Sequence, residues 1–571
     1  MNSFARYLAI GLLVLLVSGL AFAQETEDSY SLWLGGHYTD FSDYTQKVGE
    51  FNKGEDEAWP EFQINYLSRG GHGIFYLDGH FYDDENIYGR VRTVSGDTWK
   101  GTFTYRSLVK WEGADLMDNL QAREWLSGSF GGKYVTHEQL TPDAEYKTHR
   151  QEILSDMEVL LSKKNNVKLM VSHRTILQKG HEEAQSVTHC FNCHITTQAA
   201  KVDKRTHHIE AGIQADVKDM TVGYKFGYRL FESAAPEVYA YYDAARHPVN
   251  GGSGAEFSPR QIYDDTSVAL SPYPKTEKMS HKVRMKTDVG KGKLASSVTY
   301  YRAENKNTQL VSDGWSGAAK FTAPLSPRSR LIITASGARL WNDEVVVDLP
   351  IFRDGRSGYN GDFDYTRYSS LDRRNLSASA QLIHRLNLKM TLSAKAGYDQ
   401  IKRYQYPVLD NDESTGKFYG EVKMNYTKGL KYSTRVKYRF ESISNPFTSG
   451  RGLFESRGRG VLEPLGWPNQ FVYYFQREDL RYQDITTEPT QVHAFEWQSN
   501  WKPQPDVTVT VGLKGSYDKN TDLDSLDVNH FALRPNLSLT YMPSGKATLT
   551  AGYTFNSVKS RGPVAVALFD G

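Results

Sequence analysis

Apolar and polar residues alternate along many segments of about ten to thirteen residues, long enough for a tilted strand to cross a bilayer. In residues 432–441, YSTRVKYRFE, one set of alternate positions holds Tyr, Thr, Val, Tyr and Phe. The other set holds Ser, Arg, Lys, Arg and Glu. A period of two predicts a β-strand with one apolar and one polar face. The pattern recurs in residues 417–426, 221–231, 281–289 and 506–517.

Short and long connections between these segments tend to alternate, as they do in outer-membrane barrels. Tight turns are expected near residues 69–72, 162–166, 217–219, 290–293, 325–328, 386–388, 428–430, 503–506 and 543–546. Long connections are expected near residues 109–145, 178–206, 233–275, 342–372, 402–415 and 444–489. The sequence therefore predicts an all-β fold, a transmembrane antiparallel β-barrel of about 22 strands with short periplasmic turns and long outer loops. The last strand is expected near Pro563–Phe569. A large soluble β protein is the alternative.

The first residues predict export. Arg6 precedes an apolar run from Leu8 to Val17, and Ala21-Phe22-Ala23 forms a small-x-small cleavage site, which together indicate a signal peptide over residues 1–23. No later run reaches the 18 or so apolar residues of a membrane-spanning helix. No linker divides residues 24–571, which are expected to form one barrel domain in the bacterial outer membrane, in contact with its lipid.

The net charge and the motifs of the chain reduce the number of functions to consider. A net charge of +1 gives no indication of nucleic-acid binding, and the chain contains none of the common hydrolase or phosphate-loop motifs, so we do not expect an enzyme. A 22-stranded barrel is wide enough to need a plug, but about six residues separate the expected cleavage site from the first strand at Tyr30. Either long loops or another protein would fill the lumen, whose predicted lining is rich in Lys, Arg and Glu. A hydrated porin wall is the alternative for that lining.

Two cysteines carry the one cofactor motif. Cys190 and Cys193 are the only cysteines, and His194 follows the second, which gives the Cys-x-x-Cys-His pattern of c-type haem attachment. The prediction is one covalent haem c in the loop 178–206, held by both thiols, with His194 as the proximal iron ligand. The candidate distal ligands are His207, His208, His181 and His173. A Cys190–Cys193 disulfide or a zinc-binding thiol pair remains the alternative.

The signal peptide, the wide barrel without a plug and the haem motif together resemble the outer-membrane porin of porin–cytochrome electron conduits, the MtrB/PioB type. The resemblance implies that the barrel sheathes a periplasmic multihaem c-type cytochrome, which exchanges electrons with an outer-surface multihaem cytochrome. Members often carry Cys-x-x-Cys near the mature N-terminus, and this chain has none there.

The function expected from these features is a scaffold for electron transfer across the outer membrane, possessing one haem of its own. One haem cannot carry electrons across a hydrocarbon core of about 30 Å, so other proteins must supply the rest. Two alternatives remain open: a passive porin for small solutes with a Cys190–Cys193 disulfide, and a soluble exported monohaem cytochrome.

Overall fold

The computed structural model describes the barrel strands and part of their connections. The described residues are 26–40, 50–51, 57–71, 73–113, 115, 117, 135–189, 193–242, 266–270, 272–347, 352–354, 359–361, 365–367, 372–404, 414–446, 455–456, 488–521, 528–545 and 547–562. The predicted signal peptide and the predicted strand Pro563–Phe569 lie outside these ranges. Within them, no helix is long and apolar enough to cross a membrane.

One large sheet contains the long strands. They are β1 (Thr26–Thr39), β2 (Glu57–Gly70), β3 (Gly73–Phe81), β4 (Ile87–Ser95), β5 (Trp99–Trp111), β7 (Lys147–Ser162), β8 (Val167–His189), β9 (Cys193–Val217), β10 (Met220–Ser233), β13 (Thr276–Val289), β14 (Gly292–Asn305), β15 (Val311–Ser326), β16 (Ser329–Asn342), β21 (Arg373–Asn387), β22 (Met390–Arg403), β23 (Ser414–Lys428), β24 (Tyr432–Ser444), β26 (Gln491–Gln504), β27 (Val507–Lys519), β28 (Asn529–Ser544), β29 (Ala547–Thr554) and β30 (Ser557–Arg561).

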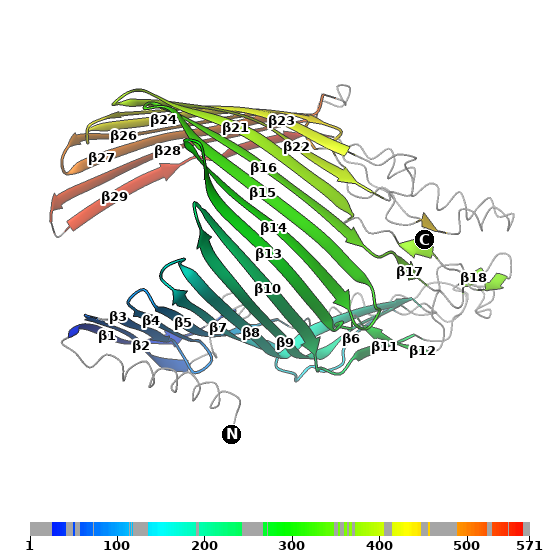
Figure 1. Cartoon of the computed structure of the whole chain (residues 1–571). Helices are drawn as coiled ribbons and strands as arrows, with labels where there is room; N and C mark the ends of the chain where they lie inside the picture. The colour runs from blue at the N-terminus through cyan, green and yellow to red at the C-terminus, as the bar shows by residue number, and fades with distance from the viewer. Residues whose placement is uncertain are drawn as a thin grey trace.

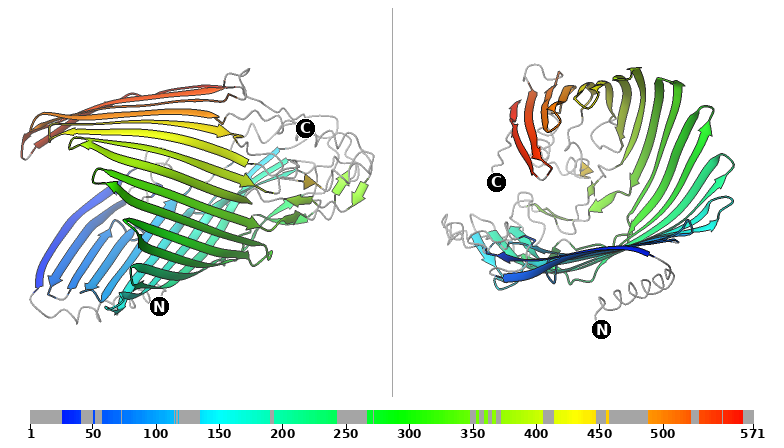
Figure 2. Two further views of the ribbon diagram at one scale, coloured as in Figure 1. Left: turned by 45° about the horizontal axis from the view of Figure 1, so that its top comes forward. Right: turned by 90° about the vertical axis from the view of Figure 1, so that its left-hand side faces the viewer.

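From β1 to β29 each of these strands pairs antiparallel with the next one listed, and the sheet curls into a barrel-like wall (Figures 1 and 2). The sheet has 23 strands. One of them is the short parallel addition β6 (Val135–Gln139), and β29 and β30 share one position because both pair with β28. This leaves 21 antiparallel positions within the described ranges, close to the predicted number. The predicted all-β antiparallel barrel fold is confirmed.

All nine predicted tight turns separate consecutive strands of the sheet. Five of the six predicted long connections also occur, and the described parts of four of them hold short strands beside or beyond the barrel (Figure 1). These are β6, already given, β11 (Val238–Tyr242), β12 (Thr266–Leu270), β17 (Val345–Val347), β18 (Phe352–Asp354), β19 (Tyr359–Gly361), β20 (Tyr365–Arg367) and β25 (Glu455–Ser456).

The prediction of a loop over residues 178–206 is wrong. These residues continue β8 to His189 and resume β9 at Cys193, so nearly the whole segment is a β-hairpin. Its register runs without interruption from Lys168↔Gln214 to His189↔Cys193. β7 stops pairing with β8 at Gly180, and the hairpin extends nine residues further, about 30 Å at the rise of an extended strand. We call residues 181–203 the hairpin arm.

The two faces of the sheet differ as the alternation predicts. On one face large apolar side chains are exposed: Val422 by 56%, Phe418 by 51% and Trp501 by 52%. Few apolar side chains of the described residues are fully buried. A soluble protein hides such residues in a core, whereas a membrane barrel presents them to lipid. The alternative of a soluble monohaem cytochrome is therefore wrong, because the fold is that of a membrane barrel.

Candidate functional site: the charged inner wall

Ion pairs cross the face of β22, β23, β24 and β26 opposite the exposed apolar side chains. Lys437 Nζ lies 3.6 Å from a Glu421 oxygen and 3.5 Å from a Glu496 oxygen, so one cation joins three strands. Arg439 donates a 2.6 Å hydrogen bond from Nε to Glu441 Oε1. Lys417 Nζ lies 3.3 Å from Asp399 and 4.0 Å from Glu441. We call this the β22–β26 ion-pair network.

A second set of ion pairs occupies strands β5 to β10. Arg174 Nε donates to Glu152 Oε1 at 2.6 Å, and Lys225 Nζ lies 2.9 Å from Glu210 Oε2. Lys168 and Lys100 both approach Glu158, at 3.0 and 3.5 Å. Strand-by-strand register from β5 to β26 places both sets on the same face of the sheet. Because the polar face of a membrane barrel lines its lumen, this face is the inner wall.

These ion pairs are too exposed to exist mainly for stability. Lys437 is 22% exposed and Glu496 39%, and such pairs each contribute about 0.2–1 kcal/mol or less. The desolvation cost of these charges is low in a hydrated lumen. Their fixed pattern can interact with any molecule that occupies the lumen. The predicted Lys-, Arg- and Glu-rich inner face is thus present, with many of its charges paired across strands.

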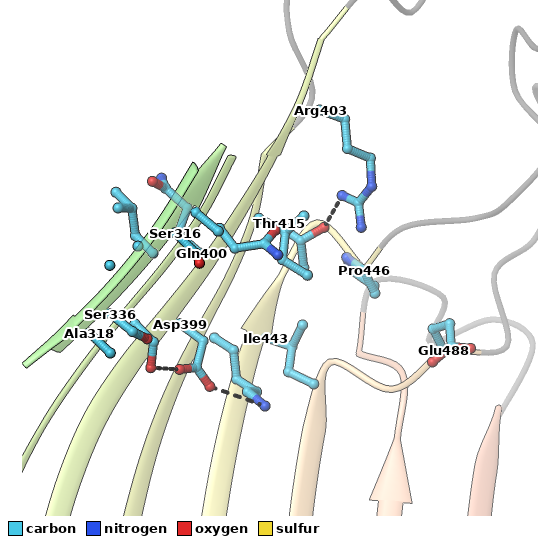
Figure 3. Close-up of a pocket in the computed structure, with 18 of the residues that line it drawn as sticks. Ser316, Ala318, Ser336, Asp399, Gln400, Arg403, Thr415, Ile443, Pro446 and Glu488 are labelled. Atoms are coloured by element: carbon cyan, nitrogen blue, oxygen red, sulfur yellow. Dashed lines mark hydrogen bonds and ion pairs between the residues drawn. The ribbon is translucent and has the colours of Figure 1, made fainter. Parts of the chain in front are cut away.

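Between the two sets the wall is hollowed. A hollow of about 740 Å³ runs from β14 across to β24, and many of its lining side chains on β14, β15, β16 and β21 are small (Figure 3). At its end Asp399 accepts a 2.6 Å hydrogen bond from Ser377 Oγ and pairs with Lys417, while Arg403 donates to Thr415 Oγ1 at 2.9 Å. Small side chains let the surface of another molecule approach the backbone closely. The lining residues with small side chains are Ser297, Ser316, Ala318, Ser336, Ala338 and Ser377.

The described residues of the haem motif, Cys193 and His194, lie at the far end of the hairpin arm. Cys190 is outside the described residues. Cys193 and His194 are the first residues of β9, where the backbone pairs with His189 and Thr188 of β8 and, in parallel, with β6. The arm is braced at its base by Tyr273, whose hydroxyl donates a 2.5 Å hydrogen bond to Glu182. Covalent haem at Cys190, Cys193 and His194 stays a prediction.

The structure places the predicted distal ligands along β8 and β9, at a distance from His194. His207 and His208 follow His194 by 13 and 14 residues along the continuous strand β9, which separates them from it by about 43 Å or more. His207 instead hydrogen-bonds Thr175 at 3.0 Å. His181 lies seven residues along β8 from Thr188, the partner of His194, or about 23 Å away. These histidines are near the motif in sequence, but they could approach His194 in space only if residues 178–206 folded back as a loop.

Across the described ranges, no cluster of three or more His, Cys, Asp or Glu side chains could hold a metal ion. The sequence analysis also missed the hollow, because small inward residues on four strands form a surface only when the strands pair. The sequence feature that could have predicted the hollow is the run of Ala, Ser and Thr at the polar positions of residues 295–299, 316–318 and 334–338.

Comparisons with known proteins give structural likeness only. No family model matches the chain, and a search of curated proteins finds no match. Among solved structures, the FrpB iron transporter from Neisseria meningitidis is 10% identical with a TM-score of 0.43, covering 87% of this chain and 75% of that one. The copper transporter OprC is 9% identical with a TM-score of 0.46, covering 93% and 74%. The siderophore receptor PiuA from Acinetobacter baumannii is 10% identical with a TM-score of 0.41, covering 92% and 76%.

Similarity at this level carries no argument about what the chain transports or binds. The long antiparallel strands, the short turns and the exposed apolar face carry the assignment instead. The chain is an outer-membrane β-barrel protein.

Proposed function

We propose that this barrel sheathes a periplasmic multihaem c-type cytochrome and so supports electron transfer across the bacterial outer membrane, with an outer-surface multihaem cytochrome as the next carrier. The inner wall is the observation that carries the proposal. It combines a barrel of at least 21 strand positions with fixed, paired charges and a hollow of small side chains. A barrel of this width without a filler would leak solutes, and a protein with a polar surface fits such a lining.

The arm adds a second element to the proposal. If haem c is attached at Cys190 and Cys193, it lies about 30 Å beyond the strand edge formed by β7, well away from the lumen. There it would meet an outer partner more readily than a carrier inside the barrel. The sheath role does not depend on this haem.

The test uses the barrel extracted in mild detergent from membranes of its own host, carrying an affinity tag. Gel separation after denaturation and a haem-peroxidase stain distinguish two bands, the co-purified cytochrome and the barrel chain itself. We expect the first band with the wild type and with Cys190→Ala/Cys193→Ala, and the second with the wild type only, because covalent haem survives denaturation.

Absence of any haem-staining partner from the wild-type preparation contradicts the sheath. The passive porin then becomes the working assignment, and a mass lower than that of the reduced chain by two hydrogen atoms would identify its Cys190–Cys193 disulfide. If only the band of the barrel chain is absent, the chain carries no covalent haem, and the proposed sheath function is unaffected.

A further inference from the structure

A stripe of six cations runs down the inner wall on β10 and β13, and among the described residues only one of them, Lys225, has a carboxylate partner, Glu210. We call Lys225, Arg229, Lys278, Lys282, Arg284 and Lys286 the basic stripe. Register places all six on the face that carries the ion-pair networks, with Lys225 beside Glu210 of β9. From Lys278 to Lys286 the stripe covers eight residues, about 27 Å, nearly the depth of a hydrocarbon core.

Like charges face each other directly across these two strands. Lys225 is the register partner of Lys282, and Arg229 is the partner of Lys278. Directly opposed like charges destabilise an antiparallel pair. Among the described residues, Arg229, Lys282, Arg284 and Lys286 have no carboxylate oxygen within ion-pair distance, and Lys278 Nζ lies over the ring of Tyr301 at 4.1 Å instead.

Two other groups of cations on the barrel have carboxylate partners. In the β22–β26 ion-pair network Lys437 has two, and at the rim Lys306 Nζ lies 3.0 Å from Glu304 and 3.2 Å from Glu277. Hydrogen bonds to those two carboxylates raise the pKa of Lys306 above its ordinary value. Five of the six cations of the basic stripe lack such a partner among the described residues, so their charge is available to an anionic surface.

We propose that the basic stripe is the docking surface for an acidic face of the protein that occupies the lumen. This rests on the proposed sheath. The stripe borders the small-residue wall of β14 and β15, where Lys282 is opposite Thr299 and Arg284 is opposite Ser297. A protein seated on that wall brings its carboxylates within reach of the cations. The barrel would then hold its occupant against the β10–β13 side of the lumen.

The first test compares co-purification of the haem-staining partner by three barrels at about 0.15 M NaCl, where surface charges act over about 8 Å. The variant is Lys282→Glu/Arg284→Glu/Lys286→Glu. The control is Lys291→Glu/Lys389→Glu/Lys431→Glu, which reverses three charges at hairpin turns. We expect the variant to retain about tenfold less partner, and the control to match the wild type within about twofold. Heat-modifiable mobility on gels confirms that each barrel is folded.

The second test does not depend on the stability of the charge-reversed variant. A photo-crosslinking amino acid replaces Arg284, or Val283 as the matched control, whose side chain is on the lipid face. We expect the haem-staining partner to be cross-linked from position 284, through an acidic segment identified by mass spectrometry, and lipid alone from position 283.

The outcomes separate the two proposals. No haem-staining partner with the wild type defeats the sheath itself. A partner retained equally by all three barrels, or cross-linked from position 284 through a segment without acidic residues, overturns the basic stripe and leaves the sheath intact. Cross-linking of position 284 to a loop of this same chain or to lipopolysaccharide also overturns it.

Discussion

Tyr419 shows how single residues shape the inner wall. It is the register partner of Gly397 and is 5% exposed, with its ring lying where a side chain at residue 397 would be. Lys395 Nζ and Arg439 Cζ lie 5.2 and 4.6 Å from the centre of that ring. Glycine permits the close approach, and the flanking cations interact favourably with the ring face. The ring links the ion pairs of β24 to the lysine on β22.

Gly397→Ala should destabilise the barrel by about 1–3 kcal/mol, because the new Cβ would meet Tyr419 Oη at 2.5 Å and displace the ring. Gly420→Ala is the matched control, since a Cβ there has nothing within 4 Å. Its effect should remain within about 0.5 kcal/mol. Urea unfolding of both variants in lipid vesicles measures the difference. Equal losses would show that the Tyr419 ring is not held over Gly397.

At the scale of elements, the hairpin of β8 and β9 is unlike its neighbours. β8 has 23 residues and β9 has 25, whereas β7 has 16 and β10 has 14. Beyond the barrel the arm is held by its own ladder, by a 2.8 Å hydrogen bond between Ser186 and Thr196, and by β6. The arm therefore adds little to the barrel wall.

Deleting residues 182–201 and joining the strands with a two-residue turn should leave the barrel assembled, because β8 and β9 keep their pairing with β7 and β10. Heat-modifiable gel mobility should be unchanged, and any haem stain of the barrel chain should vanish. Retention of the lumen partner should match the wild type. An unfolded deletion variant would show that the arm is part of the barrel's folding unit.

At the scale of the whole molecule, the wall is wide, polar inside and apolar outside. Its described edge strands, β1 and the β29–β30 pair, are not hydrogen-bonded to each other within the described residues (Figure 2). The inner surface has three sectors: two with paired charges and, between them, the hollow bordered by the basic stripe. A passive channel has no need for this asymmetry, whereas a sheath can use it to fix the orientation of its occupant.

Planar-bilayer recordings test the lumen directly. The barrel isolated with its partner should conduct little, and removal of the partner at high salt should open a large, steady conductance, because a barrel of this width encloses water once emptied. High conductance from the barrel as first isolated would favour the passive porin. Low conductance after verified loss of the partner would indicate that loops of the chain fill the lumen.

Local pattern determined much of this protein. Alternation along segments such as 432–441 fixed which residues share a face, since the side-chain period of a strand is two. Turn residues fixed where the strands reverse, and all nine expected turns are present. These features depend on residues close together in the chain, so the antiparallel fold could be predicted from the sequence. The hairpin arm could not be predicted in this way. The polar run 181–201 lacks the apolar alternation that marks a membrane strand, and its two strands are held in extended form by pairing with each other.

Only the tertiary structure decided which charges meet. Lys437 and Glu496 are far apart in sequence, and their contact depends on β24 and β26 pairing across a long connection. The basic stripe likewise appears only when register sets Lys225 opposite Lys282 and Arg229 opposite Lys278. A shift of one residue would move one strand's cations to the lipid face, where they are costly. Sequence alone determines the polarity of each face, while pairing and register determine the surface that a partner meets.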